Sequence, residues 1–282
     1  MTTPTLPAPQ YVTLPDGRRL AYDEVRPDAP RGTVLFLTGL GGTRLAWLRQ
    51  LPVLGRTYRA LALDHRDVGH SDPYTADYAI TDLADDAADA LRALNAAPAF
   101  VVGISMGGAV AQHLALRHPD LVRGLVLLST SGSFVRGERP TPEAQAALVP
   151  DFTLTPEDRA RRMYAVLSGP GFVDAHPEVV AQIAALGELL PVRPDSFVRQ
   201  YRAVGTHDAL DDLHRLQVPT LILHGDADAL IPHANAETLA ERIPGARLET
   251  YPRVGHLAPI EVPDRLTSDL QTFLDTLTET PQ

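Results

Sequence analysis

The pattern in this chain that most strongly suggests chemistry is Gly103-Ile104-Ser105-Met106-Gly107. It follows a run of β-forming residues, Phe100-Val101-Val102, and opens a helical pattern that continues to Arg117. A Gly-x-Ser-x-Gly sequence between a strand and a helix is typical of a nucleophile elbow, a tight turn that exposes the serine hydroxyl above a sheet. The Met106 amide then lies at a helix N-terminus, where it can bind a developing oxyanion. The pattern therefore predicts Ser105 as a nucleophile.

A serine nucleophile needs a general base, and the base needs an orienting carboxylate. In chains with this kind of elbow, the acid and then the histidine follow the serine along the sequence. His256 comes just after the last predicted strand, beside Gly255, and Asp226 and Asp228 follow a buried strand. These loops open at the same edge of the predicted sheet as Ser105, so the three groups can meet. Spacing alone does not choose between the two aspartates.

The chain has ten histidines, and His256 alone combines the chain order, the neighbouring glycine and the strand-end position. His224 is expected to pack or hydrogen-bond near the end of the sheet. Three other histidines lie in or directly after the segment 131–213. Solvated positions are expected for these three, His176, His207 and His214.

Alternating apolar runs and helical patterns predict the elements that position these residues. Strands that alternate with helices imply a mostly parallel, doubly wound α/β sheet. A hairpin with an Asp16-Gly17 turn precedes it. Strands are predicted over 11–14, 19–22, 33–37, 58–63, 100–104, 125–128, 220–224 and 247–251, and helices over 80–94, 106–117, 235–242 and 263–277.

Residues 131–213 interrupt this alternation, because they lack a buried-strand pattern and contain many prolines. They predict a helical cap inserted into an α/β core formed by residues 1–130 and 214–282. Ligands bind at the carboxyl ends of the strands in such sheets, so the cap is expected to cover the site. The residues expected to wall the pocket are Phe152, Met163, Tyr164 and Phe172.

Composition narrows the possible partners and compartment. The formal net charge of −10 argues against nucleic acid or an anionic membrane as the main partner. No apolar run reaches 18 residues, and residues 1–10 lack the apolar segment of a signal peptide, so a cytoplasmic location is expected. The absence of cysteine excludes disulfides, cysteine-ligated zinc and thiol catalysis. We expect a small-molecule ester as the partner and no metal or organic cofactor; monomer and homodimer both stay open.

From Tyr11 to Leu277 the chain resembles the α/β-hydrolase-fold esterases. The Gly-Ile-Ser-Met-Gly-Gly element and the Arg-Asp-x-Gly-x-Ser loop are most similar to the methylesterase branch that includes aclacinomycin methylesterase. Enol-lactonases and cofactor-free perhydrolases also resemble it. The segments that carry the resemblance are 37–42, 64–72, 103–108, 225–232 and 255–256.

The resemblance implies roles for individual residues. Asp228 corresponds to the family's catalytic acid, which leaves Asp226 to cap its loop. The amides of Leu40 and Met106 correspond to the oxyanion hole. Thr38 stands where the family usually has histidine; that side chain buttresses the oxyanion loop, and threonine can hydrogen-bond as well.

These observations predict a serine hydrolase that cleaves a carboxylic ester of a small to medium apolar substrate. Ser105 would form an acyl-enzyme, His256 would act as the base, and Asp228 would hold the imidazole. Enol-lactone hydrolysis, amide cleavage and perhydrolysis on the same triad stay open, as does a ligand receptor that retains the fold without catalysis. Epoxide hydrolases and haloalkane dehalogenases use an aspartate nucleophile, so Ser105 argues against both.

Overall fold

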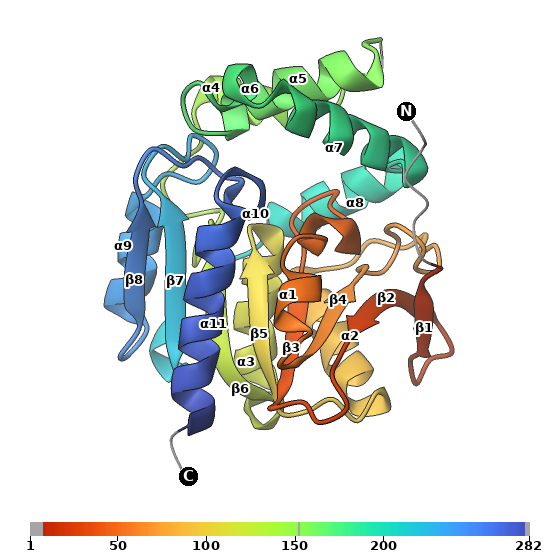
Figure 1. Ribbon diagram of the computed structural model, residues 1–282, viewed down its shortest axis with the longest axis vertical. Helices are drawn as coiled ribbons and strands as arrows, with labels where there is room; N and C mark the ends of the chain where they lie inside the picture. Colours follow the sequence, from red (N-terminus) through yellow and green to blue (C-terminus); the bar gives the residue numbers. More distant parts are fainter. Residues whose placement is uncertain (1–7, 152, 280–282) are drawn as a thin grey trace.

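The computed structural model describes residues 8–151 and 153–279. Among them, eight strands form one sheet in the order β1-β2-β4-β3-β5-β6-β7-β8 (Figure 1). The β1–β2 and β2–β4 pairs are antiparallel and all later pairs are parallel, which confirms the predicted sheet. The strands are β1 (Gln10–Thr13), β2 (Arg19–Val25), β3 (Thr33–Leu37), β4 (Arg59–Leu63), β5 (Ala99–Ile104), β6 (Val122–Leu128), β7 (Thr220–Gly225) and β8 (Arg247–Tyr251).

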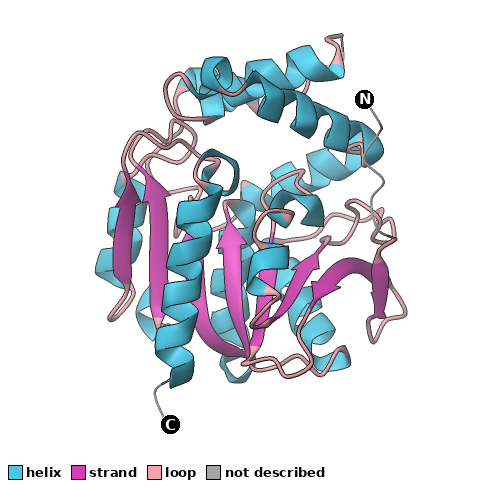
Figure 2. Cartoon of the chain, viewed as in Figure 1, coloured by secondary structure: helices cyan, strands magenta, loops and turns pink. Residues whose placement is uncertain are grey.

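Helices cover both faces of the sheet (Figure 2). Successive side chains of a strand point to opposite faces. Leu35 and Leu37 therefore pack in the core with α2, α3 and α9, while Val34 and Phe36 pack with α1 and α11. Burial on both faces explains why the central strands are near-continuous apolar runs. The helices are α1 (Leu51–Leu54), α2 (Ile80–Ala93), α3 (Met106–Arg117), α9 (Ala234–Arg242), α10 (Ala258–Glu261) and α11 (Pro263–Glu279), with single 3-10 turns at Arg44–Trp47, Pro119–Leu121 and Leu213–Arg215.

Between β6 and β7 the described chain forms five helices above the carboxyl ends of the strands (Figure 1). Proline is the first residue of four of them. The amide at this position makes no hydrogen bond within the helix, so proline, which lacks an amide hydrogen, costs nothing there. Four of the eight prolines in residues 131–213 thus begin helices, and the other four lie outside the helices. We call residues 142–204 the cap segment; the division of the chain into core and cap stays a prediction. Its helices are α4 (Pro142–Ala147), α5 (Pro156–Leu167), α6 (Phe172–Ala175), α7 (Pro177–Leu189) and α8 (Pro194–Val204).

The prediction that His207 is solvated is wrong. This residue lies where the chain returns from the cap segment and is 2% exposed. Its carbonyl accepts the amide of Phe134 at 3.0 Å, and its ring nitrogens lie 3.3 Å from the His113 ring and 3.3 Å from the Ser131 carbonyl. Burial lowers the pKa of His207 to about 3. His207 thus connects the segment that leads into the cap segment with the segment that leads out of it.

Within residues 8–151 and 153–279, no helix combines the length and the hydropathy that a membrane crossing requires.

Candidate active site

Ser105 is the turn residue between β5 and α3, with φ 55° and ψ −121°. A non-glycine residue in such a sparsely populated region costs of order 1–3 kcal/mol and is held by its surroundings. A β-carbon at Gly103 would lie less than 3.0 Å from the Gly107 backbone, and one at Gly107 would lie that close to the backbone of Leu37 and Thr38. Only glycine fits at both positions. The two glycines therefore permit the tight turn that presents Ser105.

The carboxylate of Asp228 is bonded through both oxygens. Its Oδ1 accepts the amides of Leu230 and Ile231 at 2.9 Å each, and its Oδ2 accepts His256 Nδ1 at 2.8 Å. Burial opposes ionisation, but the charge and hydrogen bonds of His256 and His224 outweigh it and lower the pKa of Asp228. An ionised carboxylate only accepts, so Nδ1 of His256 carries a hydrogen, and in the neutral ring Nε2 then has the free lone pair.

Asp226 and His224, which lie close to Asp228 in the sequence, make different contacts. Asp226 is exposed, and its Oδ1 accepts the amide of Arg253 at 2.6 Å, a contact that fits loop capping. His224 is buried with Nε2 2.7 Å from the Ile231 carbonyl and 3.4 Å from Asp228 Oδ2. His224 thus bonds near the end of the sheet, as predicted, and also contributes to the field around Asp228.

Glu261 fixes the loop that carries His256, a role that the sequence patterns do not predict. Its carboxylate accepts the amides of Gly255 and Leu257, on either side of His256, at 3.0 Å each, and a third amide from the α5–α6 turn at 2.6 Å. Burial raises the pKa of Glu261, and the three amide bonds oppose that rise. The His256 amide also donates to the Leu167 carbonyl at 2.7 Å. The histidine loop is therefore bonded directly to the end of α5.

The loop after β3 turns sharply beside Ser105. The Gly42 amide donates to the Gly39 carbonyl at 3.0 Å, and the Thr38 hydroxyl donates to the Gly42 carbonyl at 3.0 Å. Thr38 thus buttresses this loop through its hydroxyl. The amides of Leu40 and Met106 make no hydrogen bond to another residue that the structure describes. Both remain available to a ligand oxygen.

Gln200 on α8 connects the cap segment to this loop. Its side chain is completely buried, and its Oε1 accepts the Gly41 amide at 2.8 Å. Gly41 has a φ of 68°, and the Phe197 ring lies against it. The Gly41 amide is therefore occupied, whereas that of the preceding Leu40 is not. Sequence periodicity cannot predict this contact, because the two partners lie 159 positions apart.

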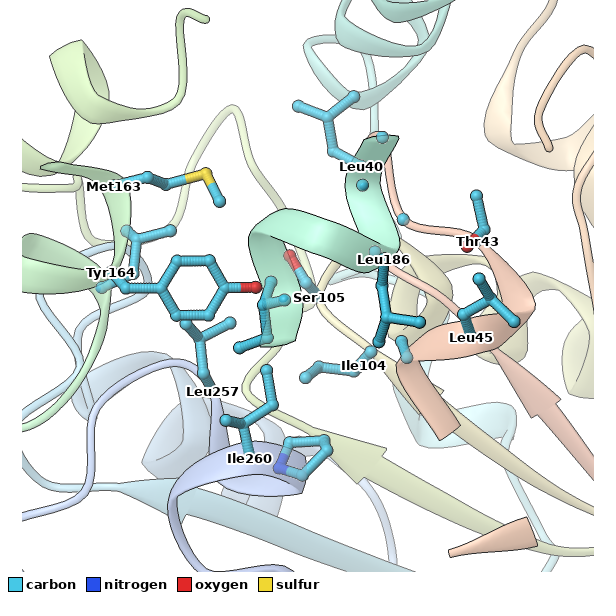
Figure 3. Close-up of a pocket in the computed structure, with 18 of the residues that line it drawn as sticks. Leu40, Thr43, Leu45, Ile104, Ser105, Met163, Tyr164, Leu186, Leu257 and Ile260 are labelled. Carbon is cyan, nitrogen blue, oxygen red and sulfur yellow. The ribbon is translucent and has the colours of Figure 1, made fainter. Parts of the chain in front are cut away.

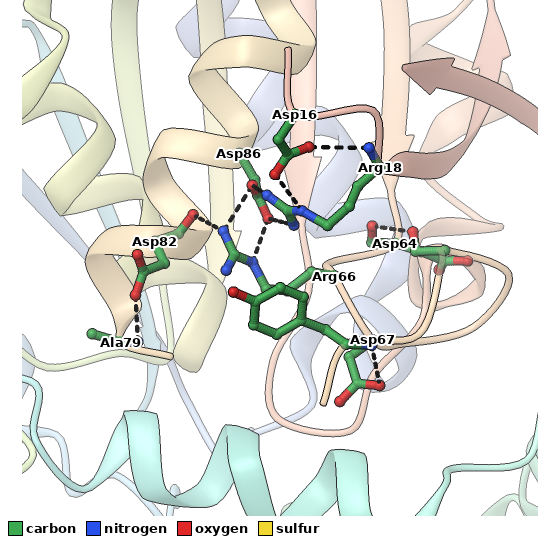
Figure 4. Close-up of polar contacts among 10 residues, drawn as sticks. Asp16, Arg18, Asp64, Arg66, Asp67, Ala79, Asp82 and Asp86 are labelled. Atoms are coloured by element: carbon green, nitrogen blue, oxygen red, sulfur yellow. Dashed lines mark hydrogen bonds and ion pairs between the residues drawn. The ribbon is translucent and has the colours of Figure 1, made fainter. Parts of the chain in front are cut away.

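Aspartates and arginines connect the loop after β4 to α2 and to α8; Figure 4 shows the α2 side of this network, around Arg66 and Asp86. Asp67, 1% exposed, accepts Arg193 at 3.1 Å and Arg199 at 2.6 Å, both from the α8 region. The neighbouring Arg66 donates to Asp86 on α2 at 2.6 and 2.8 Å. Charge-assisted bonds of this kind are among the stronger ones in proteins. The loop after β4 thus joins α2 to α8, and α8 in turn positions the loop that contains Leu40.

Ser105 and His256 line one cavity of about 400 Å³ between the strand ends and the cap segment. Figure 3 shows side chains from both parts converging on Ser105. Most of the wall is aliphatic, with Leu40, Leu45, Ile104, Leu167, Leu186, Leu190, Leu257 and Ile260 among its members. The cavity therefore suits a largely apolar ligand of modest size.

The four aromatic and sulfur side chains predicted for the pocket wall have different positions. Met163 and Tyr164 on α5 line the cavity. The prediction for Phe172 is wrong: this residue begins α6 and packs on the His176 ring with centroids 4.9 Å apart, away from the cavity lining. Phe152 lies outside the described residues. Of the three described residues in this set, Met163 and Tyr164 thus have the predicted role.

The chain belongs to the alpha/beta hydrolase fold family, whose sequence profile matches residues 32–263. It is 27% identical to 3-oxoadipate enol-lactonase 2 of Acinetobacter baylyi over 87% of this chain and 90% of the relative. It is 32% identical to 2-hydroxymuconate semialdehyde hydrolase of Pseudomonas sp. over 84% of each chain. A thermophilic esterase from Thermogutta terrifontis superposes with a TM-score of 0.78 at 26% identity, covering 96% of this chain and 100% of the esterase. These relatives support a hydrolase; the narrower resemblance to the aclacinomycin methylesterase branch stays a prediction.

Proposed function

We propose that this protein is a serine hydrolase that cleaves a carboxylic ester through the triad Ser105, Asp228 and His256. The observation that best supports the proposal is that Ser105 and His256 line one cavity while Asp228 binds the remote ring nitrogen of His256. Such an arrangement matches the roles of nucleophile, base and orienting acid. The names of the relatives, which include an enol-lactonase and an esterase, point in the same direction.

In this mechanism, Ser105 Oγ attacks the ester carbonyl while His256 Nε2 takes the proton of the Ser105 hydroxyl. Asp228 stays ionised, keeps the hydrogen on Nδ1, and stabilises the imidazolium that forms. His256 then protonates the leaving alkoxide, and an acyl-enzyme remains. Water attacks the acyl-enzyme with His256 again acting as base, which releases the acid and restores Ser105.

The free amides of Leu40 and Met106 would bind the oxyanion of the tetrahedral intermediate. Loss of one such donor typically lowers kcat by about 10²–10³-fold. Gln200 would act as a positioning residue, since its bond to Gly41 orients the adjacent Leu40 amide. The residues 131–213 would serve as a cap that shapes the acyl or alcohol pocket.

The substrate would be a small to medium, largely apolar ester, because the cavity is about 400 Å³ and its wall is mostly aliphatic. A lactone is the second candidate, favoured by the enol-lactonase among the relatives. Both reactions use the same attack on an acyl carbon, so the triad does not separate them.

The test is a panel of para-nitrophenyl esters of increasing acyl length together with simple lactones, assayed with the wild type and Ser105→Ala. We expect turnover of at least one ester or lactone, and loss of nearly all of it in Ser105→Ala with an unchanged circular dichroism spectrum. Only the contribution of binding and the oxyanion hole, about 10³–10⁴ over water in comparable triads, would remain. Full activity in Ser105→Ala, or no turnover of any member, would contradict the proposal.

A further inference from the structure

One polar group deep in the cavity has no role in the proposed triad. The side chain of Tyr164, on α5, is 7% exposed, and its ring packs among aliphatic residues that include Val180 and Leu257. Figure 3 shows its hydroxyl directed into the cavity toward Ser105. Within residues 8–151 and 153–279, no hydrogen-bond partner of this hydroxyl is found. Buried hydroxyls usually have a partner, so its orientation toward the catalytic serine needs an explanation.

The surroundings of Tyr164 define what it can do. Burial raises the pKa of its phenol, so the group is a neutral hydroxyl that can donate one hydrogen bond. Outside the triad, the other polar side chains of the cavity wall are less buried than Tyr164: Arg49 and Gln182 are exposed, and Thr43 is half-buried. Tyr164 is thus the buried donor in an otherwise aliphatic part of the wall.

We propose, on the basis of the function above, that the Tyr164 hydroxyl donates to a second oxygen of the substrate, distinct from the scissile carbonyl. The matching substrate class is an ester or lactone whose aliphatic part carries a neutral acceptor such as an ether or ketone oxygen. A carboxylate at this position would have to lose its water against aliphatic side chains, which is unfavourable without a buried cation. Tyr164 is therefore a specificity-determining residue that favours oxygen-bearing substrates over hydrocarbon ones.

The test compares isosteric substrates in which one methylene is replaced by an ether oxygen. The acyl-side pair is para-nitrophenyl pentanoate and para-nitrophenyl ethoxyacetate; the alcohol-side pair is pentyl acetate and ethoxyethyl acetate. For each substrate, kcat/KM of the wild type is divided by that of Tyr164→Phe, which cancels the intrinsic reactivity of the ester. A single neutral hydrogen bond predicts that this ratio is about 2- to 10-fold larger for the oxygen-bearing member of at least one pair.

The chain offers a matched control in Tyr78. This tyrosine is also buried with an unpartnered hydroxyl among the described residues, but it packs in the core with α2 rather than in the cavity wall. Tyr78→Phe should leave the ratios equal within each pair. Equal ratios for Tyr164→Phe in both pairs, with an active wild type, would overturn the inference and leave the proposed function intact. A wild type inactive on all four substrates and on the wider panel would overturn both.

Discussion

Asp228→Asn should abolish the base function of His256 while leaving the fold intact. The two amides that Asp228 Oδ1 accepts, from Leu230 and Ile231, require an oxygen at that position. Asparagine can place its carbonyl there, and its NH₂ group then occupies the position that faces His256 Nδ1. Because NH₂ donates, Nδ1 must become the acceptor and the ring hydrogen must move to Nε2. His256 in this tautomer cannot take the proton of Ser105.

The magnitude follows from this tautomer. An asparagine in the place of a triad aspartate lowers kcat by about 10⁴-fold in a well-studied protease. That factor corresponds to about 5.4 kcal/mol of transition-state stabilisation at 1.36 kcal/mol per tenfold. The opposite amide orientation restores the histidine contact but leaves two buried amides facing NH₂, at a cost of about 1–3 kcal/mol each. Asparagine should therefore adopt the first orientation.

Asp226→Asn is the matched control. Asp226 is exposed, and an asparagine carbonyl can still accept the Arg253 amide. Surface substitutions of this kind usually change the free energy of unfolding by no more than about 0.5 kcal/mol, so the variant should fold normally. Because Asp226 does not bond His256, kcat/KM should stay close to that of the wild type. The assay is steady-state hydrolysis of the best ester of the panel, with circular dichroism to check folding. Similar losses in both variants, or a larger loss in Asp226→Asn, would refute the assignment of Asp228.

Two further predictions concern the cap contact and the response to acid. Gln200→Leu removes the acceptor of the Gly41 amide; kcat should fall about tenfold, less than for outright loss of an oxyanion donor, with KM nearly unchanged in steady-state kinetics. A change confined to KM would count against a positioning role. Burial lowers the pKa of His65 to about 4 and that of His207 to about 3, from a usual value of 6.5. As the pH falls, the unfolded chain binds these protons before the folded protein does. The contribution of both residues to stability is therefore complete above pH 6.5 and is lost as the pH falls toward 4 for His65 and toward 3 for His207. Urea unfolding at several pH values should show this loss, at most about 1.4 kcal/mol per pH unit for each histidine; a free energy of unfolding that is constant from pH 7 to about 4.5 would contradict it.

The sequence predicts the sheet and places Ser105, Asp228 and His256 at one edge of it, because local residue patterns indicate the strands and the loops that follow them. The runs at 33–37 and 220–224 are mostly apolar and form the buried strands β3 and β7, as predicted. The tight turn at Ser105 depends on Gly103 and Gly107, each two residues away, so the five-residue pattern alone predicts it. Asp228 lies in the loop after β7 and His256 in the loop after β8, and their hydrogen bond forms where these two loops meet at one edge of the sheet. The residue pattern leaves Asp226 and Asp228 open, and the family resemblance selects Asp228.

The sequence does not predict the residues that act through contacts between distant segments. Gln200 reaches Gly41 across 159 positions, and Glu261 binds an amide of the α5–α6 turn 92 positions before it. Neither lies in a periodic pattern that would mark it. His207 is similar: its burial arises from packing against Phe134 and His113, which no feature near residue 207 in the sequence indicates.

The central claim, that Ser105 is the nucleophile, is tested most directly by covalent labelling with a fluorophosphonate. The elbow presents Ser105 to the cavity that His256 also lines, so the Ser105 hydroxyl should attack the reagent there. Mass spectrometry of the digested protein should find one adduct, on Ser105, whose formation parallels the loss of esterase activity. Ser105→Ala should not be labelled. Labelling of another serine in step with inactivation, or an active enzyme that no fluorophosphonate modifies, would contradict the account.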